Sequence, residues 1–407
     1  MDHRDWKSLT LSQLSEKRIS YGIVQTGEAQ KNGVKCLRVV DITKPRIQLD
    51  QLITTSQEIN QSYKRTILEK DELVLALRGE IGKAILVCDE LVGCNLTRGL
   101  ARISPNGNVT PAFLFQVMQS AETLRRLERR TNGSALKEIS IGELRRIALR
   151  IPPLPEQQKI AAILMSWDRA IELTEELIAT KQKRKQSVIQ SQITKPLLAL
   201  SVGSASPGWN LSKLGRFIRK RSEKSSDLKA FPLHSFTIEN GVTEKTERYE
   251  RSFLLKDSDN NKYAIVHFGD FVINPMNLRF GAIGRSRLRS SVSVSAYYDV
   301  FSVIGNDCDS SFLEYLLKSP RLMHMYERYA TGSLIEKRRV HFSEFVKIPI
   351  ALPPLREQKR IATILNAMNW EIELLVKKLA LLKQQKKGLM QQLLTGKTRV
   401  KLPKGAA

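Results

Sequence analysis

One stretch of the sequence occurs twice, first as Pro152-Pro153-Leu154-Pro155-Glu156-Gln157-Gln158-Lys159-Ile160-Ala161-Ala162-Ile163-Leu164 and again, 201 residues later, as Pro353-Pro354-Leu355-Arg356-Glu357-Gln358-Lys359-Arg360-Ile361-Ala362-Thr363-Ile364-Leu365. Of the 43 pairs that begin at Pro152 and Pro353, 16 are identical, where ordinary composition gives roughly three. This agreement indicates an internal duplication. A period near 200 residues is too long for a solenoid repeat, so each half is predicted to be a domain followed by a long helix, with approximate two-fold internal symmetry.

Composition adds one strong signal, which is charge. The chain has 407 residues, 42% of them hydrophobic, and a formal net charge of +25 at pH 7. The length and hydrophobic fraction suit several ordinary folded domains. The excess of Lys and Arg favours a polyanionic partner such as nucleic acid, because basic side chains release counterions when they neutralise phosphates. A surface of solvated basic side chains is the alternative.

The cysteines and the N-terminus bear on the compartment. The four cysteines are Cys36, Cys88, Cys94 and Cys308; they form no C-x-x-C pair and have no histidines at metal-ligand spacing. They are expected to be reduced and mostly buried. The first residues contain no apolar signal core, and no run of 18 apolar residues occurs in the sequence. A cytoplasmic protein is therefore expected.

The chain is predicted to contain two α+β domains. The expected boundaries are 1–150 for the first domain, 151–200 for the first long-helix spacer, 201–350 for the second domain, and 351–407 for the second spacer and tail. Apolar runs predict strands at residues 35–40, 73–77 and 84–87 of the first domain and at 264–266 and 270–273 of the second. One helix is expected near 110–130 and another near 311–328.

Two short segments repeat outside the helices. Residues 78–83, Arg-Gly-Glu-Ile-Gly-Lys, resemble residues 280–285, Phe-Gly-Ala-Ile-Gly-Arg, and residues 131–134 resemble residues 330–333. The glycines suit either a tight turn or a close approach of the backbone to DNA, and both interpretations stay open.

Each repeated segment then runs nearly forty residues without a further proline, which predicts a helical rod of about 57 Å at 1.5 Å per residue. Apolar residues recur at alternating steps of three and four, the pattern of a coiled-coil seam. The first seam comprises Leu164, Trp167, Ile171, Thr174, Ile178, Lys181, Lys185, Val188 and Gln192. The second comprises Leu365, Met368, Ile372, Leu375, Leu379, Leu382, Lys386, Leu389 and Leu393.

A rod cannot bury such a seam alone, so the two helices are predicted to pair as an antiparallel coiled coil. The alternative is that each helix packs on its own domain. The basic run Lys181–Lys185 suits a solvated face or a phosphate contact.

These motifs resemble those of the DNA specificity subunit of type I restriction-modification systems. The P-P-L-x-E-Q-x-x-I-A-x-I-L signature occurs twice, each copy follows a domain with a G-x-I-G element, and the second helix ends in Leu393-Leu394-Thr395-Gly396-Lys397-Thr398. The first copy departs from this ending, with Ile193-Thr194-Lys195-Pro196.

The resemblance implies that each domain is a target recognition domain that reads one half of a bipartite, asymmetric site in double-stranded DNA. It implies that the helices set the spacing of the half-sites and dock two methyltransferase subunits, through which restriction subunits join. It also implies a non-catalytic chain without metal or cofactor of its own, with S-adenosylmethionine, ATP and magnesium bound only by the partner subunits.

The residues themselves contain no convincing catalytic motif. Asn274-Pro275-Met276-Asn277 lacks the second proline and the aromatic residue of an amino-methyltransferase box. Gly396-Lys397-Thr398 imitates a P-loop ending, but Gln391 replaces its first glycine and a helix precedes it. A chain with its own methyltransferase activity, and a DNA-binding coiled-coil scaffold without a restriction partner, are the competing hypotheses.

DNA contacts are expected from basic and amide side chains in loops, because Arg and Asn match base edges while Lys mainly contacts phosphate. In the first domain the candidates are Arg78, Lys83, Arg98, Arg130, Asn132, Ser134 and Lys137. In the second they are Asn277, Arg279, Arg285, Arg287, Lys337, Arg338 and Arg339. Any one of them is also explained as a solvated surface charge, and about a third are expected to touch DNA.

Overall fold

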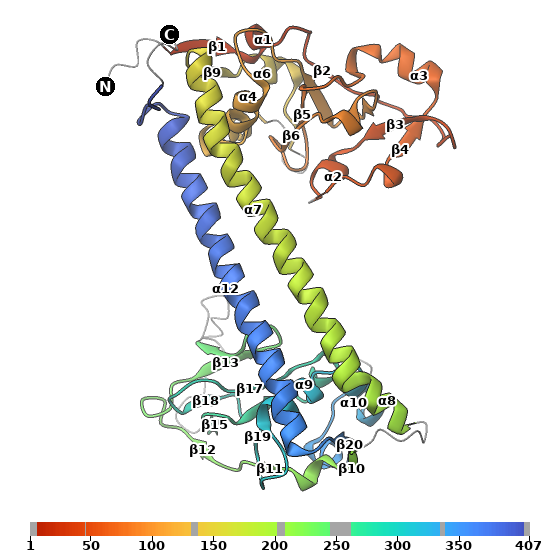
Figure 1. Cartoon of the computed structure of the whole chain (residues 1–407), viewed down its shortest axis with the longest axis vertical. Coiled ribbons are helices and arrows are strands. Elements are labelled where there is room, and N and C mark those ends of the chain that lie inside the picture. Colours follow the sequence, from red (N-terminus) through yellow and green to blue (C-terminus); the bar gives the residue numbers. More distant parts are fainter. Residues whose placement is uncertain are drawn as a thin grey trace. The chain divides into compact units, whose positions relative to one another are not determined.

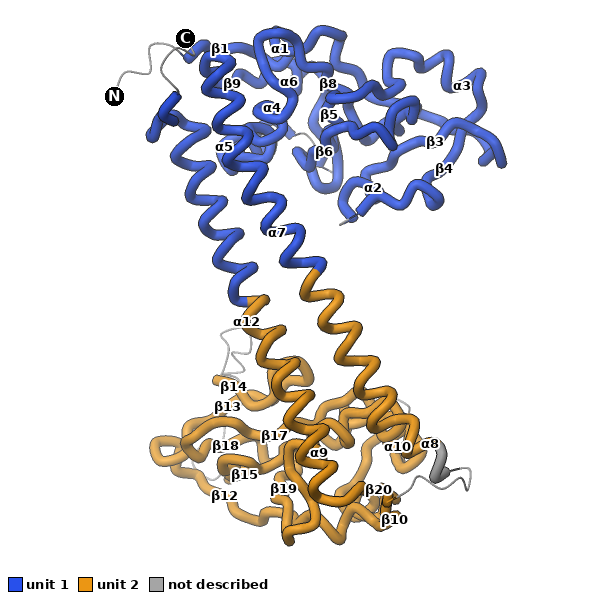
Figure 2. Tube along the Cα trace, in the orientation of Figure 1, with its two compact units in different colours: residues 1–176, 377–407 blue, residues 177–376 orange. Residues whose placement is uncertain are grey.

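The computed structural model describes residues 6–44, 46–131, 137–201, 208–244, 262–333 and 338–402. It divides into two compact units (Figure 2). One unit is formed by two separate stretches of the chain, and the other by the single stretch between them. Unit 1 comprises residues 1–176 and 377–407, and unit 2 comprises residues 177–376. Each unit therefore contains one globular domain and a part of both long helices.

Unit 1 is built on a four-stranded antiparallel sheet of order β2-β8-β5-β6, beside a three-stranded sheet of order β4-β3-β7 and the pair β1-β9. Its strands are β1 (Lys7–Thr10), β2 (Ser20–Tyr21), β3 (Val34–Leu37), β4 (Ile53–Thr55), β5 (Leu73–Ala76), β6 (Ala84–Leu86), β7 (Asn95–Leu96), β8 (Leu100–Ile103) and β9 (Ala148–Ile151). Its short helices are α1 (Leu11–Leu14), α2 (Val39–Ile42), η1 (Leu49–Gln51), α3 (Gln57–Ser62), η2 (Lys64–Thr66), η3 (Asp89–Leu91), α4 (Pro111–Met118), α5 (Ala121–Glu128) and α6 (Ile141–Arg145).

Unit 2 repeats this plan, with a four-stranded sheet of order β11-β19-β16-β17, a three-stranded sheet β12-β15-β18 and the pairs β10-β20 and β13-β14 (Figure 1). Its strands are β10 (Asn210–Lys213), β11 (Ile218–Lys220), β12 (Lys224–Ser225), β13 (His234–Thr237), β14 (Gly241–Glu244), β15 (Tyr263–Val266), β16 (Phe271–Ile273), β17 (Ile283–Arg285), β18 (Val292–Val294), β19 (Asp299–Val303) and β20 (Pro349–Leu352). Its short helices are η5 (Leu214–Arg216), η9 (Leu278–Phe280), α9 (Ser310–Leu317), α10 (Pro320–Tyr329) and α11 (Phe342–Phe345).

The central strand of each main sheet is buried on both faces. In β5, Leu73 and Leu75 join the core under helix α4, whereas Val74 joins a second core beside the three-stranded sheet. In β16, Phe271 and Val272 divide between two cores in the same way. Successive strand residues point to opposite faces, so a strand covered on both sides needs a continuous apolar run. This is why residues 73–77 lack the alternation of a half-exposed strand.

The single helix expected near 110–130 is two helices, and so is the one near 311–328. In unit 1 the Ser120 hydroxyl accepts a hydrogen bond from the Thr123 amide and begins α5. In unit 2 Ser319 begins α10 in the same way, with Pro320 in the first helical position. A capping serine starts a new helix, and the apolar periodicity across the break concealed it. The strand predicted at 35–40 is also shorter, because α2 begins at Val39.

The two long helices are α7 (Leu154–Ile189, 36 residues) and α12 (Leu355–Leu393, 39 residues), as the sequence predicts. The first turns of each pack on the domain that precedes it, with Leu164 in the core of unit 1 and Leu365 in that of unit 2. The far end of each helix belongs to the other unit, where Leu393 joins the core of unit 1 and Val188 contacts that of unit 2. Packing on the domains and pairing of the helices therefore both occur.

The glutamine of the repeated motif joins each long helix to its domain. In unit 1 the Gln157 side chain accepts a hydrogen bond from the Thr110 amide at 2.8 Å and donates to the carbonyls of Asn108 and Pro152, both at 2.9 Å. In unit 2 Gln358 makes the equivalent three bonds, to the amide of Asp309 and the carbonyls of Asp307 and Pro353. Thr110 and Asp309 are the N-caps of α4 and α9. The motif thus fixes where each long helix leaves its domain.

Within each unit α7 and α12 run antiparallel. In unit 1 Lys386 pairs with Asp168 at 2.5 Å and Lys383 pairs with Glu175 at 2.7 Å. In unit 2 Lys181 pairs with Glu371 at 2.6 Å. The seam residues named above are buried or half-buried in every case, while most residues between them are exposed. The helices therefore meet along the predicted stripe in each unit.

The ends of the two long helices differ, and the differing residue explains why. After α12, Gly396 adopts a left-handed φ of +73° and ends the helical path. The first copy has Lys195 at the equivalent position, and there the chain continues through a π-helical turn, η4 (Gln190–Thr194), into α8 (Lys195–Ser201).

Other expectations concern the cysteines and membranes. All four cysteines are free; Cys36, Cys94 and Cys308 are buried, whereas Cys88 is exposed. Burial raises the pKa of Cys36 and of Cys308 to about 12. Among the helices of the described residues, none has the length and apolar character needed to cross a membrane.

Candidate nucleic-acid interface

The G-x-I-G segment of unit 1 forms the turn between β5 and β6. Gly79 and Gly82 have φ values of +69° and +84°, and a Cβ on Gly82 would lie 2.5 Å from the Leu124 side chain. The structure therefore supports the turn interpretation of these glycines. Arg78 begins the turn, is exposed, and packs so closely against Gly99 that a Cβ there would lie 2.8 Å from the arginine Nε.

The structure brings Arg78 near a second candidate, Arg98, because Arg98 directly precedes Gly99, against which Arg78 packs. Arg98 is exposed and its amide donates to the Ile23 carbonyl at 2.8 Å. Lys83 is half-buried within the turn. Arg130 forms an ion pair with Glu143 at 3.2 Å, and Lys137 is exposed. Asn132 and Ser134 lie outside the described residues.

In unit 2 two candidates converge on one buried acid. Glu314 of α9 has a side chain only 10% exposed, and it pairs with Arg285 at 3.5 Å, Arg287 at 3.3 Å and Lys318 at 3.1 Å. Arg285 also donates to the Ser310 hydroxyl at 2.6 Å, and its side chain is 17% exposed. The Arg287 side chain is 55% exposed. The Arg287 side chain is thus far more accessible to a DNA base than the Arg285 side chain is.

The remaining candidates of unit 2 divide similarly. Arg279 is 10% exposed and lies 3.6 Å from Glu327, and Arg338 pairs with the same acid at 2.9 Å and donates to the Ala330 carbonyl. These two arginines hold α10 against neighbouring loops. Asn277 and Arg339 are exposed. Lys337 lies outside the described residues, and the role of every candidate in DNA contact stays a prediction.

Sequence reasoning missed a concave basic surface in unit 1, here called the basic recess. It has a volume of about 460 Å³. Its basic side chains are Lys17, Arg18, Arg65, Arg102 and Arg145, with Ser20 and Tyr21 beside them.

Three of these bases have no acidic partner. Lys17 pairs with Glu69, and Arg102 lies 3.6 Å from the buried Glu72. No acid among the described residues pairs with Arg18, Arg65 or Arg145. Burial and, second, the charge of Arg18 lower the pKa of Arg145. The Nε of Arg145 is buried without a hydrogen-bond partner in the described structure. Unneutralised neighbouring guanidinium groups favour an anion such as phosphate.

The recess could not be read from the sequence because its bases come from four separate elements or loops. Arg65 lies on η2, Arg102 on β8 and Arg145 on α6, while Lys17 and Arg18 precede β2. No linear charge run marks them. Short basic pairs such as Lys17-Arg18 and Lys64-Arg65 occur, but nothing in the sequence places them together.

Two further observations concern metal binding and the segments that resemble catalytic motifs. No group of three or more His, Cys, Asp or Glu side chains in the described ranges is placed to hold a metal ion. Asn274 accepts a hydrogen bond from the Met276 amide in a turn. Gly396 follows helix α12 and ends its helical path. The two segments that superficially resemble catalytic motifs therefore have structural roles.

Comparison with known proteins identifies the family. The family model for the type I restriction modification DNA specificity domain matches the chain twice, at residues 3–180 and 208–384. The chain belongs to this family, and the two matches correspond to the two copies of the duplication.

Curated relatives agree. The EcoBI specificity subunit of Escherichia coli is 26% identical over 47% of this chain, and the match spans only 41% of that protein. The MjaVIII specificity subunit of Methanocaldococcus jannaschii is 25% identical over 71% of this chain and 70% of its own length. The putative MjaX specificity subunit of the same organism is 25% identical over 98% of this chain and 94% of its own.

Two solved structures share the fold. The S subunit of a type I restriction-modification system from M. genitalium superposes with a TM-score of 0.62 at 12% identity, covering 98% of this chain and 97% of that one. A chain from a structure on complex assembly and conformational transition of the type I system gives 0.54 at 16% identity, covering 96% and 98%.

Proposed function

We propose that this chain is the non-catalytic subunit that gives a type I restriction-modification complex its DNA sequence specificity, with each unit reading one half of a bipartite, asymmetric site. The carrying observation is that the family match occurs twice and that each matched copy supplies a recognition domain with its own core. Two homologous but different domains suit two different half-sites. The paired helices would set the distance between them.

The charge of unit 1 supports a role for the basic recess in holding the DNA backbone. Arg18, Arg65 and Arg145, which have no acidic partner among the described residues, present guanidinium groups that match phosphate oxygens. Backbone contacts of this kind position a protein on the duplex, while exposed loop residues such as Arg287 and Arg339 would read base edges.

The outer faces of the long helices support docking of methyltransferase subunits. In unit 1 Leu173 and Leu381 are 47% and 58% exposed, and in unit 2 Trp370 is 65% exposed. These exposed apolar side chains on the helices are available for contact with a partner subunit. Restriction subunits would join through the methyltransferase subunits, and S-adenosylmethionine, ATP and magnesium would bind to these partners.

The test is reconstitution with the methyltransferase subunit of the same system. Site-selective adenine methylation that requires this chain is the expected result. Unselective or absent methylation, when another specificity subunit restores selectivity to the same preparation, would overturn the proposal. Binding of S-adenosylmethionine by the isolated chain would instead favour a methyltransferase, and DNA binding without sequence preference would favour a general scaffold.

A further inference from the structure

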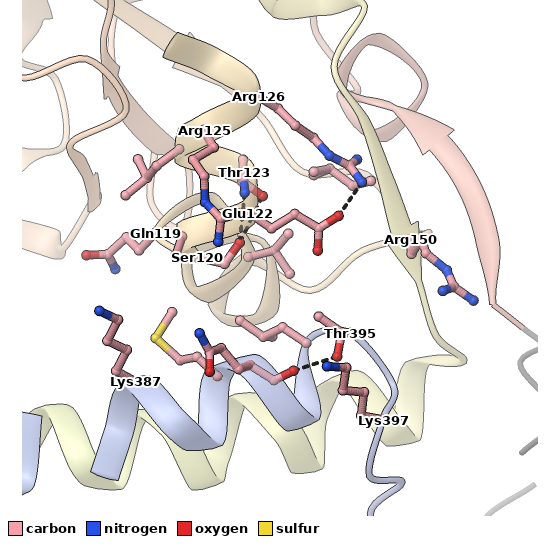
Figure 3. A pocket seen from close by; sticks show the side chains of 17 residues that line it. Gln119, Ser120, Glu122, Thr123, Arg125, Arg126, Arg150, Lys387, Thr395 and Lys397 are labelled. Atoms are coloured by element: carbon pink, nitrogen blue, oxygen red, sulfur yellow. Dashed lines mark hydrogen bonds and ion pairs between the residues drawn. The ribbon is translucent and has the colours of Figure 1, made fainter. Parts of the chain in front are cut away.

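Unit 1 contains a second hollow, here called the α5 pocket, between α5 and the end of α12 (Figure 3). Its volume is about 640 Å³, within the range of pockets that bind sizeable ligands. Arg125 extends from α5 toward the α12 side of the pocket, where Lys387 lies, and Lys397 is at its edge. Arg150 of β9 also lines the pocket, but its side chain points away from these bases and lies over the Trp6 ring at 5.8 Å. The pocket is thus framed by a globular domain and a long helix of the same unit.

Positive charge in this pocket is largely unneutralised. Among the described residues that line it, the one acid is Glu122, which pairs with Arg126. Arg125 and Lys387 are exposed, and no acid in the described part of the chain pairs with either. An anionic ligand would therefore gain charge-assisted hydrogen bonds without displacing an existing ion pair.

Between the bases the lining combines an apolar part with the polar side chains of Gln119, Ser120, Thr123, Gln391 and Thr395. Val117 and Leu149 are buried beneath it, and Leu394 and Met390 of the α12 end complete it. None of the described residues that line the pocket is aromatic, so they offer no platform on which nucleic-acid bases could stack. A DNA backbone has phosphates but no apolar group to cover such a lining. A protein segment with carboxylates beside an apolar anchor matches both features.

The internal duplication supplies a comparison within one chain. When α5 and α10 are aligned at their capping residues Ser120 and Ser319, Arg125 and Arg126 correspond to His324 and Met325. At the 201-residue offset of the repeated segments, Arg150, Lys387 and Lys397 correspond to Ala351, Gln186 and Pro196. The equivalent of Glu122 is Arg321. Met325 and Ala351 are apolar and are buried in the core of unit 2. These five bases are therefore specific to unit 1 and are not a requirement of the shared fold, whereas unit 2 has Arg184 and Lys195 at other positions near the corresponding end of α7.

We propose that the α5 pocket binds an acidic, apolar-anchored segment of a methyltransferase subunit, and that the equivalent face of unit 2 does not. This inference rests on the proposed function, since it names where one partner docks. It adds that docking is unequal between the two ends of a duplicated chain. One partner subunit is held by charge-assisted contacts, and the other is not.

The test uses the full chain with Arg125→Glu and Lys387→Glu combined, and isothermal titration with the purified methyltransferase subunit. Two binding events are expected for the wild type, and the tighter one should weaken at least tenfold in this variant. The matched control combines His324→Glu and Gln186→Glu in unit 2 and should change affinity less than twofold. Arg125→Lys with Lys387→Arg keeps both charges and should bind like the wild type. Unchanged thermal melting checks that the variants fold.

Four outcomes separate the possibilities. Unchanged methyltransferase binding by the charge-reversal variant overturns the pocket proposal and leaves the proposed function standing. Equal weakening by the control variant overturns the inequality between units. If the charge-reversal variant binds a random 30-base-pair duplex more weakly but still binds the methyltransferase subunit normally, the pocket proposal is overturned in favour of nucleic acid as the ligand. Failure of the wild type to bind methyltransferase overturns the pocket together with the docking function.

Discussion

Gln157→Leu should destabilise unit 1 and leave unit 2 intact. Gln157 is fully buried and makes three hydrogen bonds, to the Thr110 amide and to the carbonyls of Asn108 and Pro152. Leucine has a similar shape but cannot form these bonds, so one buried and two part-buried backbone groups lose their partners. At a net 0.5–1.5 kcal/mol for each bond, the expected loss is about 3 kcal/mol.

Hydrogen exchange measured by mass spectrometry resolves the two units. A loss of about 3 kcal/mol corresponds to roughly 100-fold faster exchange of the most protected amides. We expect this in β5 and β8 of unit 1, with β16 and β19 of unit 2 unchanged. Gln358→Leu should produce the mirror result, because Gln358 makes the equivalent bonds. The exposed neighbour Gln158→Leu is the control. A change below threefold, or equal acceleration in both units, would refute this reasoning.

Arg399→Gln should cost roughly 2–3 kcal/mol in urea unfolding, because Glu156 is 2% exposed and loses a two-pronged ion pair at 2.7 and 2.8 Å; a loss under 0.5 kcal/mol would contradict it. Lys185→Leu should raise the free energy of unfolding by roughly 1 kcal/mol at pH 7, since burial, followed by Lys318, lowers the pKa of Lys185 and the charged form is disfavoured in the fold. In the wild type that penalty is present at pH 7 and disappears as pH rises through the lowered folded pKa and then the unfolded pKa, so the advantage of the variant should shrink as the pH approaches the ordinary lysine pKa of about 10.4. An advantage that stays constant up to that pH would exclude this cause. Cys88 should be the one thiol that reacts rapidly with a maleimide in the native protein, and rapid labelling that survives Cys88→Ser would show that the buried cysteines are accessible.

The sequence predicted the helices better than the site. A duplicated motif and a stripe of apolar residues at steps of three and four are local patterns, so α7, α12 and their contact face could be derived from them. The break at Ser120 could not, because the apolar period continues across the cap. The basic recess could not either, since Arg65 and Arg145 are far apart in sequence and come together only through the fold. Burial of Arg285 against Glu314 likewise depends on tertiary packing.

We propose that two homologous recognition domains, one in each unit, recognise separate DNA sequences. Mapping methylated bases across the genome of a host that expresses the chain with its methyltransferase tests this most directly. We predict two short specified sequences separated by a gap of fixed length and unspecified sequence. Arg287→Ala with Arg339→Ala should relax one sequence and leave the other and the gap unchanged. A single continuous recognition sequence, or a variant that relaxes both sequences equally, would contradict the account.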